Sequence, residues 1–100
     1  MIAVIFEVQM RAGCEQEYFD LAAALRAELA EIDGFISIER FQSLATSGKY
    51  LSISFWRDEA AVARWKANAD HQAAQTAGKE RIFSGYRIRV AEVIRDYGND

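Results

Sequence analysis

The order in which the apolar spacing changes along the chain is the feature that most restricts its fold. Four segments alternate between apolar and other residues, as a strand does, and they are residues 2–11, 35–42, 50–56 and 82–95. Two segments between them repeat apolar residues every three or four positions, as an amphipathic helix does, and they are residues 15–32 and 58–77. This order predicts a ferredoxin-like α+β fold (βαββαβ), with a four-stranded antiparallel sheet and both helices on one face.

Three residues set the expected limits of the helices. Gly34 follows the first helical segment, and glycine readily adopts the left-handed conformation that ends a helix. Asp58 precedes the second segment, and aspartate is a favoured N-cap. We expect this second helix to reach about Asn68, to break at Asp70, and to resume over residues 71–77.

Length and composition limit the class of protein. A chain of 100 residues has room for one domain, residues 1–100. The net charge of −3 and the lack of a basic stripe argue against a nucleic-acid partner. The single Cys14 fits a reducing compartment, and no apolar run approaches the roughly 20 residues of a membrane helix. The first residues lack the basic region of a signal peptide. We therefore expect a soluble, cytoplasmic domain.

Several strands are apolar on both faces, although the helices can cover only one face of the sheet. Residues 2–5 are all apolar, and residues 50–56 carry large apolar side chains on both sides. Exposed apolar faces of this kind mark interfaces. The last strand would span about 46 Å, so it either bends near Gly85 or reaches a partner. We expect a homodimer that packs through the helix-free face.

Three short motifs resemble one known family. They are the run Gly34 to Phe41 (GFISIERF), the run Tyr50 to Ala60 (YLSISFWRDEA), and Ala63-Arg64-Trp65. Each is similar to the corresponding part of the antibiotic biosynthesis monooxygenase domain, and the likeness covers about residues 2–95. The resemblance implies a dimeric α+β barrel, in which two sheets close on each other and C-terminal strands cross between subunits.

The family that the chain resembles divides by chemistry. One branch oxygenates polycyclic anthrones or quinols without metal or flavin, and another degrades heme with an asparagine on the first strand and a Trp/His pair on the second helix. This chain keeps Trp65 but has Phe6 at the asparagine position and Ala74 or Gln75 at the histidine position. Neither of those two side chains ligates heme iron as imidazole does. The resemblance thus implies a cofactor-independent monooxygenase acting on a small aromatic molecule.

Four residues are the candidates for that chemistry. His71 is the only histidine, and imidazole titrates near neutrality, so it is the candidate base. Trp65 is the candidate pocket wall, and Gln75 or Tyr86 the candidate donors to an oxyanion. We expect Trp65 and His71 to border one pocket between the second helix and the sheet. Each of the four also has a structural reading, as a cap, a core residue or a satisfied hydrogen-bonding group.

Two other functions remain open on the sequence alone. The chain is alternatively a non-catalytic dimeric ligand-binding or stress-related module, or a heme-binding relative with altered ligands. A filled interface between the helices and the sheet would favour the module, whereas a titratable group in an apolar pocket would favour the enzyme. No glycine-rich phosphate loop and no zinc motif occurs, so the sequence predicts no nucleotide or metal site.

The arginines of the strands raise a separate question. Arg40 follows Ile36 and Ile38 on one strand face. An inward arginine there requires an acidic partner or an anionic ligand, unless the strand has already reached the surface at that point. Arg87 and Arg89 share a face of the last strand, and we expect them to pair with Glu7 or Glu39 across the sheet.

Overall fold

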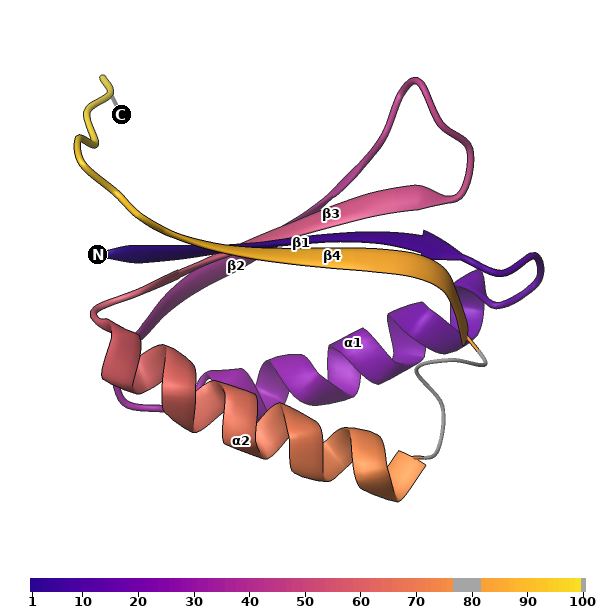
Figure 1. The fold of residues 1–100 in the computed structure, drawn as a ribbon, viewed down its shortest axis with the longest axis horizontal. Helices are drawn as coiled ribbons and strands as arrows, with labels where there is room; N and C mark the ends of the chain where they lie inside the picture. The colour runs from indigo at the N-terminus through magenta and orange to yellow at the C-terminus, as the bar shows by residue number, and fades with distance from the viewer. Residues whose placement is uncertain (77–81, 100) are drawn as a thin grey trace.

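The computed structural model describes residues 1–76 and 82–99, with the side chains of residues 69–76 left out. Its elements follow the predicted order, and they are β1 (Ile2–Met10), α1 (Glu15–Leu29), β2 (Phe35–Gln42), β3 (Lys49–Trp56), α2 (Glu59–Thr76) and β4 (Phe83–Glu92). The strands form one antiparallel sheet in the order β2-β3-β1-β4. Both helices lie on the same side of this sheet (Figure 1). The ferredoxin-like prediction is therefore confirmed.

Alternation along β1 divides its side chains between the two faces of the sheet. Ile2, Val8 and Met10 are buried toward the helices, because residues with even numbers on β1 share that face. The register carries this division to the neighbouring strands. Val4 lies opposite Ser54 of β3 and Val90 of β4, so all three belong to the helix-facing side.

The helix-facing side holds two separate cores. One contains Val8, Met10, Tyr18, Ile82 and Phe83, and the other contains Ile2, Leu29, Trp56 and Ala61. Trp56 is completely buried, and its indole packs edge-on against the ring of Phe35, with centroids 5.3 Å apart. Over the residues that the structure describes, neither helix is long and apolar enough to cross a membrane.

The helix limits differ from the predicted ones at two places. The first helix ends at Leu29, three residues before the expected limit, and a hydrogen-bonded turn follows in which the amide of Ile32 donates to the carbonyl of Leu29. The predicted break at Asp70 is wrong, because α2 runs without interruption from Glu59 to Thr76. The alanines around Asp70 favour a helix, and they outweigh the capping preference of one aspartate.

Two bulges change the predicted strands. The pairing of β2 with β3 shifts between Phe35 and Ser37, so Ile36 has no partner opposite and is 52% exposed. Phe35 and Ile38 therefore both pack on the second core, and the prediction that Ile36 and Ile38 share a face is wrong. On β4 the register skips Ser84, beside Gly85, and pairing ends at Glu92 rather than residue 95.

Gly34 joins the turn after α1 to the start of α2. Its φ is +95°, its carbonyl accepts the amide hydrogen of Arg57 at 2.7 Å, and a Cβ placed on it would lie 2.6 Å from the Cβ of Ala61. The position therefore requires glycine for its backbone conformation and for the close contact with α2.

We expect Gly34→Ala to lower the free energy of unfolding by about 2–4 kcal/mol, from the left-handed backbone and the overlap with Ala61. Urea denaturation measures this loss. In the Gly34→Ala/Ala61→Gly double variant, the overlap disappears while the backbone strain remains. Its loss should thus be smaller than the sum of the two single losses, and strict additivity would show that the contact with Ala61 is not tight.

Candidate functional site

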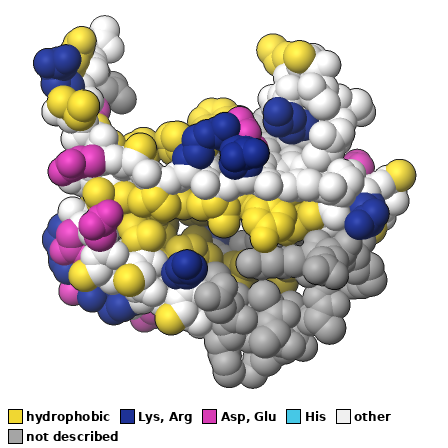
Figure 2. Space-filling model, viewed as in Figure 1, with side chains coloured by type: hydrophobic (Ala, Val, Ile, Leu, Met, Phe, Trp, Pro, Cys, Tyr) yellow, Lys and Arg dark blue, Asp and Glu magenta, His cyan; other side chains and the backbone are white. Residues whose placement is uncertain are grey.

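The helices leave one edge of the sheet partly uncovered on their own side. Tyr86, Ile88 and Val90 of β4 face the helices, because they lie in register with Val8, Phe6 and Val4 of β1. Yet these three β4 side chains are 55%, 52% and 52% exposed. Figure 2 shows a band of hydrophobic side chains along this strand with a recess beneath it. We call Tyr86, Ile88 and Val90 the β4 row.

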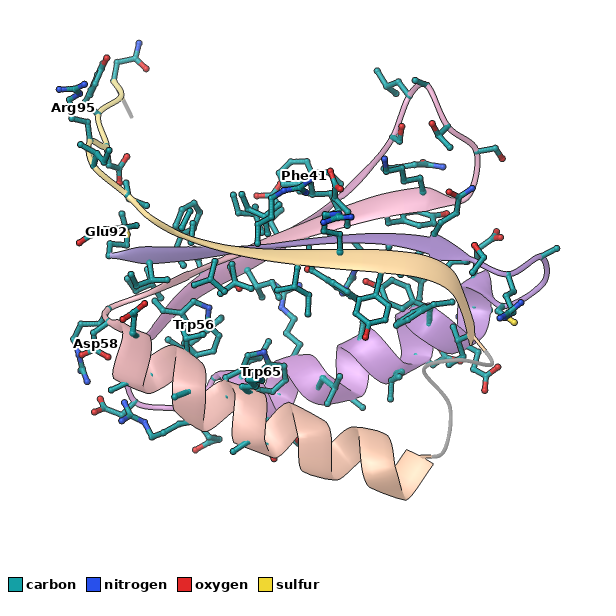
Figure 3. The ribbon with its side chains drawn as sticks, viewed as in Figure 1. Phe41, Trp56, Asp58, Trp65, Glu92 and Arg95 are labelled. Atoms are coloured by element: carbon teal, nitrogen blue, oxygen red, sulfur yellow. The ribbon has the colours of Figure 1, made fainter. Side chains whose placement is uncertain are left out.

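Two stacked indoles lie between α2 and the sheet. The rings of Trp56 and Trp65 have centroids 6.4 Å apart and are inclined by 22°. Trp56 is fixed further because its Nε1 donates a hydrogen bond to the Oγ of buried Ser54 at 2.9 Å. Figure 3 shows both rings in the layer between α2 and the strands. The indole of Trp65 therefore lies on the side of α2 that faces the strands, and Trp65 is partly exposed.

Phe6 links the β4 row to the first core. Its ring lies 5.9 Å from the ring of Phe83 and 5.9 Å from that of Tyr86, in edge-to-face arrangements. Tyr86 and Phe83 are also in contact, at 6.1 Å. The side chain at the position where the resemblance expects the asparagine of the heme branch is therefore one member of an aromatic cluster.

The remaining two candidates lie on α2. His71 and Gln75 belong to its C-terminal half, and their side chains lie outside the described residues. That His71 and Gln75 meet Trp65 or Tyr86 stays a prediction. A helix break at Asp70 would have opened space beside His71, whereas α2 continues through this position.

The sequence reasoning missed an open pocket of about 320 Å³ at the start of α2. It is lined by Met1, Ile2, Arg57, Asp58, Glu59, Val90, Ala91 and Glu92. These residues come from both ends of the chain and from its middle, so no local sequence pattern predicts the pocket. Val90 belongs both to the lining of this pocket and to the β4 row.

Asp58 begins α2 as predicted. Its Oδ1 accepts the amide hydrogen of Ala61 at 2.9 Å. This bond and a second one from Arg57 hold the pKa of Asp58 below its usual value. Arg57 also forms an ion pair with Asp33 at 3.0 Å, and this pairing lowers the pKa of Asp33. Asp58 therefore stays ionised at neutral pH, where it caps the helix and is unsuited to be a general base.

The strand arginines divide between the two faces. Arg89 pairs with Glu7 at 3.1 Å on the helix-free face, as predicted, and the bond lowers the pKa of Glu7. Arg40 is partly buried on the helix-facing side. Its Nε donates to the hydroxyl of Tyr18 at 3.3 Å, and its guanidinium lies 5.2 Å from the centre of the Tyr18 ring. The alternative in which the strand has already reached the surface at Arg40 is therefore wrong.

No group of three or more His, Cys, Asp or Glu side chains that could hold a metal ion occurs among the described residues. The charged side chains that line the pocket at the start of α2 are Arg57, Asp58, Glu59 and Glu92. The other side chains that the structure describes on this surface, Trp65 of the first half of α2 and the β4 row, are aromatic or apolar. Such a surface binds a flat or alicyclic organic molecule better than an ion.

Comparison with solved structures places this fold among known ones. It matches SnoaB, a cofactor-independent oxygenase from Streptomyces nogalater, with a TM-score of 0.79 and 17% identity, over 98% of this chain and 97% of that one. It also matches a variant of MhuD that holds two manganese protoporphyrin IX molecules per active site, with a TM-score of 0.74 and 19% identity, over 99% and 100% of the chains. At these identities the likeness shows the fold alone.

The sequence comparisons identify the family. A curated relative, the jasmonate monooxygenase ABM of Pyricularia oryzae, is 44% identical over 93 residues, which is 93% of this chain and 43% of the relative. The chain thus spans less than half of that protein's length. The family profile for antibiotic biosynthesis monooxygenase matches residues 1–77, which include β1 and all of α2. This chain belongs to the antibiotic biosynthesis monooxygenase family.

Proposed function

We propose that this protein is a monooxygenase that oxidises a small aromatic or polycyclic phenol or quinol without a metal or flavin. The half-exposed β4 row beside the stacked indoles carries the proposal, because it offers an apolar surface and an aromatic wall to a flat substrate. Membership of the family and the fold shared with SnoaB support the reaction class. The substrate class itself rests on the resemblance and on the aromatic lining.

The proposed chemistry requires a base and hydrogen-bond donors. His71 takes a proton from the substrate, and the resulting electron-rich anion passes an electron to dioxygen. For an anthrone the atoms balance without a co-reactant: one methylene group and one dioxygen give one carbonyl and one water. Gln75 or Tyr86 donates a hydrogen bond to the oxygen on which negative charge develops. Trp65 holds the ring system from the side of α2.

The similarity to the fungal jasmonate monooxygenase favours a second substrate class. At 44% identity over almost all of this chain, that relative supports an alicyclic carboxylic acid as the alternative to a phenol. Ile88 and Val90 of the β4 row also suit a saturated ring, because an apolar surface does not distinguish strongly between flat and puckered rings.

Isotopically labelled dioxygen tests the proposal. The purified protein, treated with a chelator, is incubated with dithranol, a naphthoquinol or jasmonate, beside a protein-free control for autoxidation. We expect one labelled oxygen atom in the dithranol product, formed faster than in the control. Labelling of jasmonate alone would replace the phenolic class by the alicyclic one. No labelling with any substrate would favour the non-catalytic module, and loss of the Soret band of added hemin with a reductant would favour the heme relative.

The proposal includes a homodimer formed through the helix-free face of the sheet. The centre of this face is apolar and partly exposed, and its residues are Ile5, Phe41, Leu51, Ile53 and Phe55. Phe41 is 47% exposed and stands on this face in Figure 3. The turn between β2 and β3 and the residues after β4 both rise on the same side (Figure 1), and they carry Leu44 and Tyr97, which are 104% and 89% exposed. Such a patch favours a self-complementary contact.

Ile53→Lys should convert the dimer to a monomer, because the new charge lies on the central strand β3, between Glu39 of β2 and Ile5 of β1. Sedimentation velocity at micromolar concentration measures the change. Ala63→Lys, on an exposed position of α2, adds the same charge away from the sheet and should leave the dimer intact. A wild-type protein that sediments as a stable monomer would contradict the assembly.

A further inference from the structure

We infer that Arg40 binds the carboxylate of an apolar, ring-containing acid that enters between the helices and the sheet. This inference rests on the proposed function for the reaction, and it adds a charged group to the substrate and a residue that orients it. Its support is the place of Arg40 in the sheet, the geometry of its guanidinium and the absence of an acidic partner among the described side chains.

The register places Arg40 in the interior layer. Arg40 pairs with Ser52 of β3, which pairs with Phe6 of β1, which pairs with Ile88 of the β4 row. One row across the helix-facing side of the sheet therefore runs from the guanidinium of Arg40 to the half-exposed side chain of Ile88. Ser52 and Ser54, in the middle of this side, are small and buried. Trp56 lies four residues beyond Ser52, about 13 Å along the strand.

Tyr18 orients the guanidinium through a hydrogen bond to Nε alone. The hydroxyl of Tyr18 occupies Nε, at 3.3 Å, and the Tyr18 ring lies under the cation at 5.2 Å. Tyr18 is itself 5% exposed and packs in the first core, so it is held firmly. The two terminal nitrogens of Arg40 are then the atoms that remain for a ligand, and their parallel N–H groups match the two oxygens of a carboxylate.

The charge of Arg40 is not matched by any described carboxylate, in contrast to other arginines of the chain. Arg57 pairs with Asp33 and Asp58, and Arg89 pairs with Glu7. Among residues 1–68 and 82–99, Arg40 has Tyr18 as its polar partner and no ion pair. A partly buried cation without an anion is unfavourable, and an anionic ligand offsets that cost. Binding of the acid group at Arg40 then fixes the orientation of the ring system on the helix-facing side of the sheet.

A matched pair of probes separates the charge from the ring. Isothermal titration calorimetry of the full chain compares α-naphthylacetate with its neutral isostere α-naphthylacetamide. We expect the wild type to bind the acid more tightly than the amide. Arg40→Gln should lower the affinity for the acid by roughly ten-fold or more and leave the affinity for the amide nearly unchanged. Arg40→Lys keeps the positive charge but lacks the two parallel N–H groups of the guanidinium, so it should retain only part of the affinity for the acid. Arg89→Gln, on the opposite face, removes the same charge and should have no effect.

Tyr18→Phe tests the orientation of the guanidinium. This variant removes the hydroxyl that holds Nε and keeps the ring. It should therefore lower the affinity for the acid by less than Arg40→Gln does and leave the affinity for the amide unchanged. Equal binding of acid and amide by the wild type would overturn the inference. So would an Arg40→Gln variant that loses thermal stability but keeps its preference for the acid, because Arg40 would then serve the fold. These titrations require no turnover, so an inactive protein with Arg40-dependent binding refutes the proposed function alone.

Discussion

Replacing His71 with alanine should lower kcat for a phenolic substrate by about 100- to 10,000-fold, the range that a general base supplies. This corresponds to about 3–5 kcal/mol of activation free energy. Without the imidazole, the substrate must lose its proton to water before it can pass an electron to dioxygen. Steady-state oxygen consumption measures the loss, and circular dichroism checks that the variant keeps the fold.

The control for His71→Ala lies on the same helix. Lys66 is exposed on α2, and Lys66→Ala should leave kcat unchanged. A base must also be neutral to act, so activity of the wild type should fall in acid as imidazole becomes protonated, and the variant should lack that dependence. Full activity of His71→Ala would end the catalytic assignment and leave the family and the fold untouched.

Trp56→Ala should lower the free energy of unfolding by about 3–5 kcal/mol, as removal of a large buried aromatic side chain does. Trp56 has no exposed surface and contacts the rings of Phe35 and Trp65, so its loss leaves a cavity at the centre of the second core. Urea denaturation followed by circular dichroism measures the change.

Trp56→Phe separates the ring from its hydrogen bond. Phenylalanine leaves the Oγ of Ser54 without the indole donor that lies 2.9 Å away in the wild type. Because it fills most of the same volume, Trp56→Phe should lower the free energy of unfolding clearly less than Trp56→Ala does. Equal costs for the two variants would show that the hydrogen bond, rather than the packed volume, stabilises this core.

The fold was predictable because its strands and helices differ in period, and period survives small local irregularities. The bulge at Ile36 was not, because one extra residue preserves the alternation before and after it while exchanging the faces. The continuity of α2 through Asp70 was missed for a different reason. A single capping residue competes with the helix-forming residues on both sides, and the summed helix propensity of the segment determines whether the helix continues.

The candidate site was predictable only in part. Trp65 lies on the inner side of its helix, in contact with Trp56, and its role as a pocket wall stays a prediction. The pocket at the start of α2 combines Met1, Arg57 and Glu92, which no spacing in the sequence connects. For Arg40 the sequence defined the alternatives, and the register and the contact with Tyr18 decided in favour of an inward side chain.

The stacked indoles give this protein a built-in optical signal. Trp56 and Trp65 are the only two tryptophans, so the whole indole absorbance of the chain comes from one pair that joins β3 to α2. Neighbouring chromophores at 6.4 Å couple electronically, and their coupling depends steeply on mutual angle. Ultraviolet circular dichroism of the unlabelled protein thus records any tilt of α2 against the sheet in real time, and stopped-flow mixing with a ligand resolves when that tilt occurs.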